Sequence, residues 1–502
     1  MEYEAVIGLE THVQLKTQSK MWCGCANAFG SDPNTNVCPI CLGMPGVLPV
    51  PNAEAIRLTV LTGYLLNCEI PRFAKFDRKN YFYPDSAKNY QVTQYDKPST
   101  ANGWLEFEFD GPGSVDGMAR VRITRAHLEE DVGKNSHFER FSGVDFNRAG
   151  VPLLEIVSEP ELNGPEMTYA YLRALTDVLF RGGISDCDLE KGMVRCDVNV
   201  SVRPKGSTQL GAKIEIKNMN SFSGARRALE YEIPRQIAAL KRGETLRQET
   251  RRWDDLAGIT EAMRSKEDAH DYRYFPEPDL MPLVPNDEWL ASVKAQVVEL
   301  PLARKKRFIR EYGLPDGDAA TLEETGAPGL WGEAGYTSLE RRWGRPTAEV
   351  NGIGGGYQGE GSKTVIGREA MAKLSFRLVP DQNPREILDL AAAHLRSVCP
   401  PSCRIEVELG HWGPAYVMDP HSAHGKAAQR ALTRAFSGEP RLIREGGSIP
   451  IIQAIKDTLG VDSLLLGLAL PDCQIHSPNE NFTVSNFEAG IRLNQALLEE
   501  LA

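Results

Sequence analysis

The sequence predicts an α+β fold built on an antiparallel sheet, and three observations lead to this prediction. The 502 residues are 41% apolar and 25% charged, as in ordinary globular proteins, and are enough for two to four domains. Broad apolar faces at helical spacing predict helices at 52–66, 164–180 and 222–241. Short runs rich in apolar and β-branched residues predict strands at 4–16, 104–109, 118–125, 152–158, 194–202 and 212–217. This mixture indicates an α+β domain.

Net charge and the start of the chain restrict location and partners. The formal charge of −11 argues against a generic basic nucleic-acid binder, although a local basic patch could still hold RNA phosphates. The first residues lack a basic segment followed by an apolar one, and no run of about 18 uncharged apolar residues occurs later. We therefore expect a cytoplasmic protein without a membrane partner.

Four cysteines near the N-terminus have the spacing of a metal site. Cys23 and Cys25 form a Cys-x-Cys pair, and Cys38 and Cys41 form a Cys-x-x-Cys pair after a short polar loop. Four thiolates can close a tetrahedral shell around zinc, which predicts structural zinc without a position for catalytic water. The alternative is a loop of reduced thiols that no longer binds metal.

Acidic and basic side chains come in dense packets inside strand-like sequence. The packets lie at 10–12, 77–85, 127–134, 145–155 and 195–203. So many acids cannot all face an apolar layer, so we expect them to converge on a cleft. Carboxylates hold magnesium together with nucleotide phosphates, and neighbouring Arg and Lys neutralise a transferring phosphoryl group. No P-loop motif is present. A magnesium-dependent phosphoryl-transfer site and salt-bridged structural carboxylates both remain open at this point.

The sequence after residue 300 contains a basic segment, a stretch rich in Gly and Pro, and then a different pattern of expected strands and helices. A basic segment at 301–313 predicts a helix that either contacts RNA phosphate or exposes a solvated face, and 314–335 is rich in Gly and Pro, as expected of a linker. Beyond it we expect β-rich sequence at 345–380, helices at 384–396 and 422–436, and strands at 404–410 and 464–470. A small α/β layer followed by part of a larger one fits this order.

Several motifs resemble the B subunit of the glutamine-dependent aspartyl/glutamyl-tRNA amidotransferases. They are FDRKNYFYPD (76–85), HLEED (127–131), NRAGVPLLEIVSEP (147–160), EIKNMNSF (215–222) and MRSKEDAHDYRYFPEPDL (263–280). The resemblance runs from Tyr3 to about Leu322 and implies a glutamine-synthetase-like cradle domain. It also implies an ATP-dependent ligase of protein biosynthesis that phosphorylates Asp or Glu misacylated onto tRNA(Asn) or tRNA(Gln). Ammonia then displaces the phosphate. The implied partners form a heterotrimer: an amidase (A) subunit that makes the ammonia and a small C subunit.

The same resemblance assigns residues to sites. It implies a catalytic magnesium site at Glu10, His12, Glu129 and Glu155, and structural zinc at Cys23, Cys25, Cys38 and Cys41. It further implies nucleotide-binding or channel positions at Lys79, Tyr81, Asp197, Asn199 and Arg203. The cofactors would be ATP, magnesium and structural zinc.

The last third resembles a different family, the carnosinase-like zinc dipeptidases and deacylases. The motifs are GEAGYTSLER (332–341), RPTAEVNGI (345–353), AKLSFRLVPDQ (372–382), REGGSIPI (444–451) and QIHSPNENF (474–482). The resemblance covers 325–502 and implies part of a lid domain plus an α/β hydrolase remnant. His476 matches a zinc ligand, whereas Arg377, His411 and Ser448 match substrate-contacting positions. The other ligands belong to the half that is missing, so a zinc pair could not form and hydrolysis is not expected.

The expected organisation is therefore a cradle domain with its zinc clip at 1–300, a basic helix and linker at 301–335, a lid-like domain at 336–420 and a hydrolase fragment at 421–502, with a seam near residue 324. The leading hypothesis is an amidotransferase B subunit whose tRNA-gripping tail is replaced. A dipeptidase-like hydrolase fragment and an inactive fusion remain as alternatives. Preference for Asp-tRNA or Glu-tRNA does not follow from the sequence.

Overall fold

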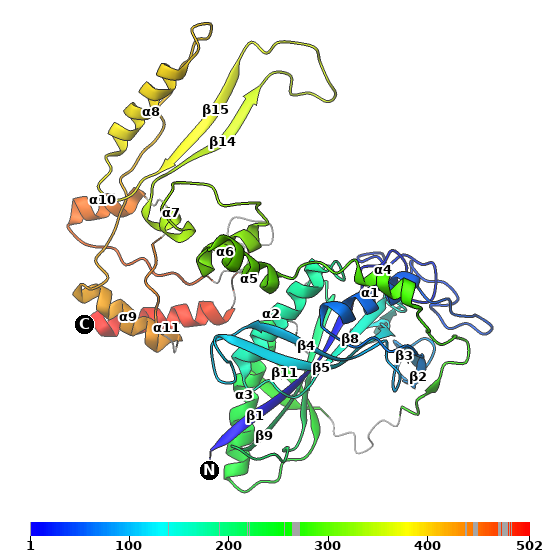
Figure 1. Cartoon of the computed structure of the whole chain (residues 1–502). Coiled ribbons are helices and arrows are strands. Elements are labelled where there is room, and N and C mark those ends of the chain that lie inside the picture. Colours follow the sequence, from blue (N-terminus) through cyan, green and yellow to red (C-terminus); the bar gives the residue numbers. More distant parts are fainter. Residues whose placement is uncertain are drawn as a thin grey trace. The chain divides into compact units, whose positions relative to one another are not determined.

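The computed structural model divides the chain into two compact units, unit 1 (Met1–Lys306) and unit 2 (Arg307–Ala502) (Figure 1). The structure describes residues 2–138, 140–189, 191–217, 219, 221–255, 257–263, 272–436, 439–444, 450–469, 473, 480, 482 and 484–501.

Unit 1 is built on an eight-stranded sheet of order β12-β11-β10-β9-β1-β8-β5-β4. Neighbouring strands are antiparallel, except that β10 and β11 run parallel. The strands are β1 (Tyr3–Gln14), β4 (Thr100–Glu108), β5 (Met118–Glu130), β8 (Pro152–Ser158), β9 (Val194–Pro204), β10 (Ile214–Lys217), β11 (Glu249–Asp254) and β12 (Ile259–Ala262). The predicted antiparallel sheet is thus present, with β1 at its centre.

The two faces of this sheet differ in chemistry because side chains alternate along each strand. In β1, Ile7, Leu9 and Val13 point to one face and are fully buried with apolar residues of the helices. Those helices are α1 (Ala53–Leu65), α2 (Pro165–Arg181) and α3 (Phe222–Lys241). Glu10 and His12 alternate with these residues and therefore point to the opposite face. One face is thus the core and the other carries polar groups.

Local signals fix where these helices begin. The side chain of Asn52 accepts hydrogen bonds from the backbone nitrogens of Glu54 and Ala55 at the start of α1. Ser221 does the same for Gly224 in α3, and α2 begins with Pro165, whose missing N–H is not needed in the first turn.

A second sheet of order β13-β2-β3 brings distant segments together. Its strands are β2 (Asp77–Asn80), β3 (Tyr90–Thr93) and β13 (Phe275–Pro276). Arg78 of β2 donates to both carboxylate oxygens of buried Glu277 at 2.6 and 2.7 Å, which fastens the segment after residue 271 to β2. A hairpin of β6 (Lys134–His137) and β7 (Ser142–Asp145) and helix α4 (Asp287–Lys294) complete this part of unit 1.

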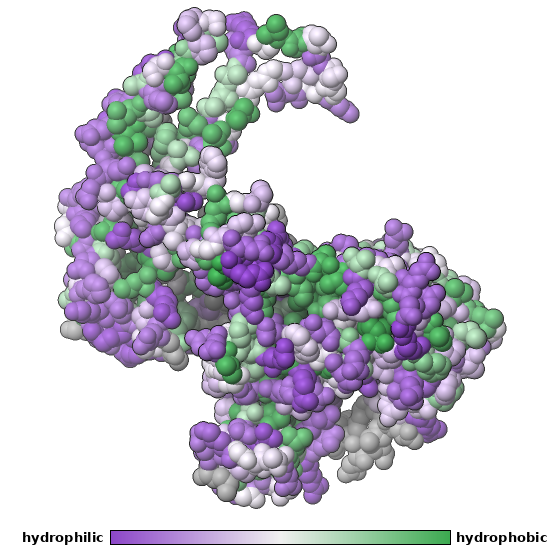
Figure 2. Space-filling model, viewed as in Figure 1, coloured by the Kyte–Doolittle hydropathy of each residue, from purple (hydrophilic) through white to green (hydrophobic). Residues whose placement is uncertain are grey.

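Unit 2 has little buried core in its described residues. Helix α5 (Pro301–Tyr312) crosses from unit 1, and α6 (Asp316–Thr325), α7 (Ser338–Gly344), β14 (Thr347–Gly355), β15 (Ala370–Arg377), α8 (Pro384–Val398), α9 (Ala423–Phe436), α10 (Pro450–Leu459) and α11 (Val484–Leu501) follow. One small cluster joins α9 to α11, and another contains Phe308, Ala319 and Leu322. Figure 2 shows hydrophobic side chains at the surface over α8 and the β14–β15 hairpin; they include Val350, Ile353 and Leu390.

Two strands that the sequence predicts for this region are absent from the described residues. Residues 404–410 and 464–469 form no strand, and position 470 lies outside the described chain. An isolated strand leaves its backbone groups unpaired, and no neighbouring strand is present to pair with these runs. The stretch expected to be a linker contains helix α6, and the boundary between the units lies before it. No helix among the described residues combines the length and apolar character needed to cross a bilayer.

Candidate functional site

Strand register assembles a row of polar side chains on the open face of the sheet. His12 of β1 is paired with Arg195 of β9 on one side and with Glu155 of β8 on the other. Glu155 is in turn paired with His127 of β5. Neighbouring strands lie about 4.8 Å apart, so these side chains meet directly.

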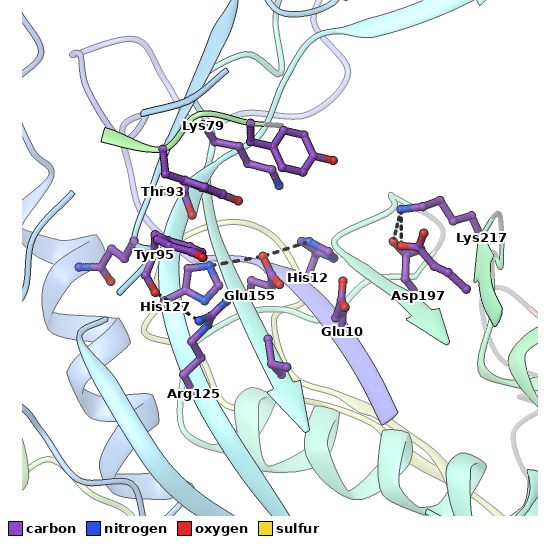
Figure 3. A pocket seen from close by; sticks show the side chains of 15 residues that line it. Glu10, His12, Lys79, Thr93, Tyr95, Arg125, His127, Glu155, Asp197 and Lys217 are labelled. Carbon is purple, nitrogen blue, oxygen red and sulfur yellow. Dashed lines mark hydrogen bonds and ion pairs between the residues drawn. The ribbon is translucent and has the colours of Figure 1, made fainter. Parts of the chain in front are cut away.

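The centre of this row is a cluster of ionisable groups (Figure 3). The Nε2 atom of His12 lies 3.5 Å from Oε1 of Glu129 and 3.7 Å from Oε2 of Glu155. The Nε2 atom of His127 lies 3.4 Å from the same Oε2 of Glu155. Figure 3 shows Glu155 between the two histidines. His127 is buried, and its Nδ1 has no hydrogen-bond partner within the described structure.

Burial makes the electrostatics of this cluster unfavourable without a cation. Burial first, and then the nearby carboxylate of Glu155, raise the pKa of Glu129 to about 8. Burial also lowers the pKa of His12. One ligand atom from each of His12, Glu129 and Glu155 lies within 4.8 Å of the others. A divalent cation would offset the repulsion between these carboxylates, and carboxylate oxygens are the ligands that magnesium prefers, so the group fits such an ion.

A second acidic group adjoins the first on β1, β9 and β10. Carboxylate oxygens of Glu10, Asp197 and Glu215 also lie within 4.8 Å of one another. Lys217 neutralises part of this charge, since its Nζ lies 2.9 Å from Asp197 and 3.0 Å from Glu215. Burial, followed by the charge of Glu155, raises the pKa of Glu10, which shows that the two acidic groups are electrostatically linked.

Residues of both groups line one cavity of about 410 Å³, whereas buried Glu129 is not among the lining residues. Figure 3 shows Asp197 and Lys217 on one side of the cavity, Glu10 and His12 in the middle, and Glu155, His127, Arg125 and Tyr95 on the other side. The lining residues are Glu10, His12, Lys79, Thr93, Gln94, Tyr95, Arg125, His127, Glu155, Val157, Asp197, Glu215, Lys217, Tyr272 and Tyr274.

Two cations of the cavity have no carboxylate partner within 4.0 Å among the described residues. The Nζ atom of Lys79 lies 5.0 Å from the ring centre of Tyr272. Burial by itself would lower the pKa of Lys79, but nearby negative charge, first that of Glu129, raises this pKa. Arg125 donates from Nη1 to the backbone oxygen of Tyr95 at 3.2 Å, and its Nε is buried without a hydrogen-bond partner. These cations are positioned to bind negative charge on a substrate.

Not every residue assigned by the resemblance lies at this cavity. Asn199 is next to it and donates to Oε1 of Glu10 at 2.9 Å. Tyr81 stacks on Tyr83 with ring centres 4.9 Å apart and is not a lining residue. Arg203 forms an ion pair with Glu4 at 2.7 Å. It lies six residues after Asp197 on β9, which separates the two positions by about 20 Å along the strand.

Ten cavity residues received no role from the sequence. They are Thr93, Gln94, Tyr95, Arg125, His127, Val157, Glu215, Lys217, Tyr272 and Tyr274. Alternation along β5 places Arg125, His127 and Glu129 on one face, so the strand period could have identified the first two. No comparable signal connects Tyr95 with Tyr274, whose rings stack with centres 4.1 Å apart from segments far apart in sequence.

The four cysteines form a separate site in unit 1. The Sγ atom of Cys41 lies 3.5 Å from Cys23, 3.7 Å from Cys38 and 3.8 Å from Cys25. A tetrahedral zinc with Zn–S bonds of about 2.3 Å requires sulfur atoms about 3.8 Å apart. The donor set and its spacing therefore fit zinc, with all four positions supplied by protein. We call residues 20–41 the zinc clip.

The residues assigned from the dipeptidase resemblance are dispersed or undescribed. Arg377 lies at the end of β15 beside Glu349, and His411 is exposed in a segment without secondary structure. Ser448 and His476 lie outside the described residues. Groups of three or more potential metal ligands occur, in the described chain, only in unit 1.

Comparison with known proteins finds two families in the chain, and their matched ranges overlap at 263–291. Residues 5–291, more than half of the chain, match the family model of the GatB/GatE catalytic domain. The B subunit of the aspartyl/glutamyl-tRNA(Asn/Gln) amidotransferase of Thermoanaerobacter sp. (strain X514) is 55% identical over 64% of this chain and 67% of its own length. The corresponding B subunit from Thermodesulfovibrio yellowstonii is 54% identical over 70% of this chain and 73% of its own.

Residues 263–403 match the family model of the peptidase dimerisation domain. A di-peptidase structure from Saccharomyces cerevisiae has 33% identity and a TM-score of 0.31, covering 36% of this chain and 38% of its own. Human carnosine dipeptidase 1 has 25% identity and a TM-score of 0.33, covering 39% and 43%. Because both TM-scores are low, the assignment of this segment rests on the family model. The chain thus belongs to the GatB/GatE family through residues 5–291 and joins that catalytic domain to a segment of the peptidase dimerisation type.

Proposed function

We propose that unit 1 is the ATP-dependent half of an aminoacyl-tRNA amidotransferase. It would phosphorylate the side-chain carboxylate of Asp or Glu carried by tRNA(Asn) or tRNA(Gln) and convert it to the amide. The observation that carries this proposal is the cavity in which His12 and Glu155, grouped with buried Glu129, adjoin two cations without carboxylate partners. The similarity to B subunits of aspartyl/glutamyl-tRNA(Asn/Gln) amidotransferases supports the reaction class.

The chemistry has two balanced steps. A side-chain carboxylate oxygen attacks the γ-phosphorus of ATP, a new O–P bond forms, and ADP leaves with the electrons of the broken bond. The nitrogen of ammonia then attacks the acyl carbon, phosphate leaves, and a base in the cavity takes the proton that ammonia loses. The first step is needed because an ionised carboxylate is a poor electrophile without a leaving group.

The residues of the cavity and buried Glu129 would divide this work. Glu10, His12, Glu129 and Glu155 would hold magnesium, which when bound neutralises charge on the transferring phosphoryl group. Lys79 and Arg125 would bind the anionic substrate groups and hold the reacting oxygen close to the phosphorus. Asn199 would keep Glu10 oriented through their hydrogen bond.

Partners follow from the proposed reaction. Ammonia would come from a separate amidase subunit with a small C subunit joining the two chains, and misacylated tRNA would be the second substrate. The glutamine-synthetase-like cradle would be the eight-stranded sheet with its open polar face. Structural zinc in the clip would hold the loop that follows β1.

A conversion assay tests the proposal. The full chain is incubated with ATP, magnesium, Glu-tRNA(Gln) and ammonium chloride, so that no amidase subunit is needed, and Gln-tRNA(Gln) is measured. We expect conversion that Glu10→Ala or Glu155→Ala reduces at least about 100-fold. Glu4→Gln is the matched control, since Glu4 lies on β1 outside the cavity. Absence of conversion in the unaltered chain, or equal rates in all variants, would refute the proposal.

A further inference from the structure

The zinc clip contains a lysine whose side chain is completely buried. Lys20 is 0% exposed and is one of the largest fully buried side chains of the described structure. Its Nζ donates to the backbone oxygen of Asn36 at 2.9 Å and to Sγ of Cys41 at 3.5 Å. A lysine is almost never fully buried unless its charge is paired, so the position of Lys20 requires an explanation.

No carboxylate supplies that pair. Within the described part of the chain, no carboxylate oxygen lies within 4.0 Å of Nζ of Lys20, whereas Lys16, Lys88 and Lys217 each have an acidic partner. The sulfur of Cys41 is the hydrogen-bond partner of Lys20 that can carry negative charge, whereas the nearby carboxylate of Glu130 is paired with Lys88. The counter-charge of Lys20 is therefore in the clip.

Charge balance in the loaded clip accounts for this arrangement. Four thiolates around one doubly charged zinc ion leave a net charge of minus two in a partly buried site. We propose that the ammonium group of Lys20 is the charge partner of the zinc-bound thiolates, and that its hydrogen bond to Cys41 stabilises the metal-loaded clip. This role concerns zinc retention and is independent of the proposed amidation.

Backbone contacts place Lys20 where it can act on both halves of the clip. Its own N–H donates to the carbonyl of Cys25 at 2.9 Å, while its Nζ binds the carbonyl of Asn36, two residues before Cys38. Asn36 is held in turn by the side chain of Asn147, which accepts from its N–H at 2.8 Å. Lys20 therefore links the Cys-x-Cys half to the Cys-x-x-Cys half as well as offsetting their charge.

The first experiment measures zinc retention in the full chain. Zinc-loaded protein is mixed with a chromogenic zinc chelator, and the transfer of zinc is followed for Lys20→Met, which keeps side-chain length without charge. We expect metal affinity to fall about 10- to 100-fold, as is common when a group bonded to a ligand is removed. Lys16→Met is the matched control, because Lys16 is exposed, lies outside the clip and pairs with Asp186.

Two further readouts separate a charge partner from a merely structural residue. In the cobalt-substituted protein, loss of a hydrogen bond to sulfur should shift the sulfur-to-cobalt charge-transfer band to lower energy in Lys20→Met. The difference in melting temperature between zinc-loaded and metal-free protein should also shrink, because the metal-free form gains when a buried charge is removed. A structural role alone would lower both melting temperatures together.

The outcomes decide the proposal. Faster zinc loss, a shifted band and a smaller melting-temperature difference support it. Retention and band position equal to those of the unaltered chain would overturn it. If Lys20→Met does not fold, Lys20→Arg decides: zinc retention at the level of the unaltered chain supports a need for charge, and rapid zinc loss from a folded Lys20→Arg protein contradicts it.

Discussion

At the scale of single residues, Glu155 shows how register produces the site. Its carboxylate lies between His12 and His127 because β8 lies between β1 and β5 and all three positions are directly paired. A shift of one residue in either pairing would turn these side chains to the helical face. The geometry of the cluster therefore depends on strand pairing, with no contribution from a mobile loop.

Arg125 provides a prediction at this scale. Since it faces the cavity without a carboxylate partner within the described chain, it should bind the anionic part of a substrate. Replacing it in Arg125→Gln should lower kcat/KM for conversion about 10- to 100-fold, the usual cost of losing a hydrogen bond to a charged group. Steady-state kinetics with varied ATP and varied aminoacyl-tRNA would show which substrate it binds.

Arg120→Gln is a suitable control, because Arg120 lies on the same strand but stacks on Trp104 outside the cavity. A kcat/KM for Arg125→Gln that equals the control with both substrates would remove Arg125 from the binding machinery.

The sequence identified part of this site and missed the rest for physical reasons. The proposed magnesium ligands were obtained by resemblance, and composition alone left structural carboxylates equally possible. His127 and Arg125 share the face of Glu129, so strand alternation was a usable signal for them. Tyr95 and Tyr274 meet because the β13–β2 pairing and the Arg78–Glu277 ion pair hold distant segments together, and no local pattern contains that information.

At the scale of secondary-structure elements, α3 is attached to the edge of the sheet by one buried carboxylate. Glu232 is 0% exposed and accepts hydrogen bonds from Arg235 at 2.6 and 2.8 Å and from Thr260 of β12 at 2.7 Å. Burial by itself would raise the pKa of Glu232, but these hydrogen bonds outweigh burial and lower the pKa. The helix and strands β11 and β12 are thereby held together by a satisfied polar network.

Breaking this network should destabilise unit 1. Glu232→Gln removes the buried carboxylate beside half-buried Arg235 and Arg251, which keep Glu249 as a partner, and should cost about 1–3 kcal/mol of unfolding free energy. Because the folded pKa is lowered, the contribution is present above the ordinary pKa and is lost as pH falls through the folded value. Denaturant titrations from pH 7 to pH 3 should therefore show a difference from the unaltered chain that shrinks on acidification.

Glu230→Gln is the matched control for this measurement. Glu230 lies on the same helix but is exposed and pairs with Arg226 at 3.6 Å. We expect its stability to stay within about 0.5 kcal/mol of the unaltered chain. A Glu232→Gln protein as stable as Glu230→Gln at pH 7 would show that the network does not stabilise α3.

The sequence predicted helices and strands correctly where the apolar pattern is long and the apolar face packs against the core. The strand at 152–158 and the helix at 222–241 have the predicted bounds, because alternation or helical spacing is sustained over their whole length. Strands β2, β3, β6 and β7 have four residues each, too few for a period to show. The error at 404–410 has the opposite cause: the alternation is present, but no partner strand exists to pair with it.

At the scale of the whole molecule, the two units differ in how they are stabilised. Unit 1 has one extensive buried cluster, whereas the described part of unit 2 has small clusters and a long exposed connection between β14 and β15 at 356–369. Limited trypsin digestion should cut that connection first, at Lys363 or Arg368, and leave unit 1 intact. If trypsin cut inside unit 1 at an earlier time than it cut this connection, unit 1 would not be the more stable of the two units.

The part of the B-subunit relatives that this chain does not match leads to a prediction about substrate affinity. The chain covers 67% of the Thermoanaerobacter relative, and residues 263–403 match the peptidase dimerisation domain. If the unmatched part of that relative grips tRNA, loss of a second contact region should weaken tRNA binding about 100-fold or more. Filter binding of both proteins to one tRNA would measure this, and equal affinities would contradict it.

The seam between the sources could be placed only approximately from sequence. The change of style near residue 324 falls inside the region where the structure has α6, and the compact units divide after Lys306. A high content of Gly and Pro indicates a turn, but it does not show which of the two units a short neighbouring helix packs against. Phe308, Ala319 and Leu322 place α5 and α6 in one small cluster of unit 2.

The central claim is that the cavity activates a carboxylate by phosphorylation, and an isotope transfer tests it most directly. Glu-tRNA(Gln) labelled with oxygen-18 in the side-chain carboxylate is incubated at saturating concentration with the full chain, ATP, magnesium and ammonium. The account predicts that each inorganic phosphate formed with Gln-tRNA(Gln) carries one labelled oxygen, because the O–P bond made in the first step survives when the C–O bond breaks. Product formation with unlabelled phosphate would contradict it.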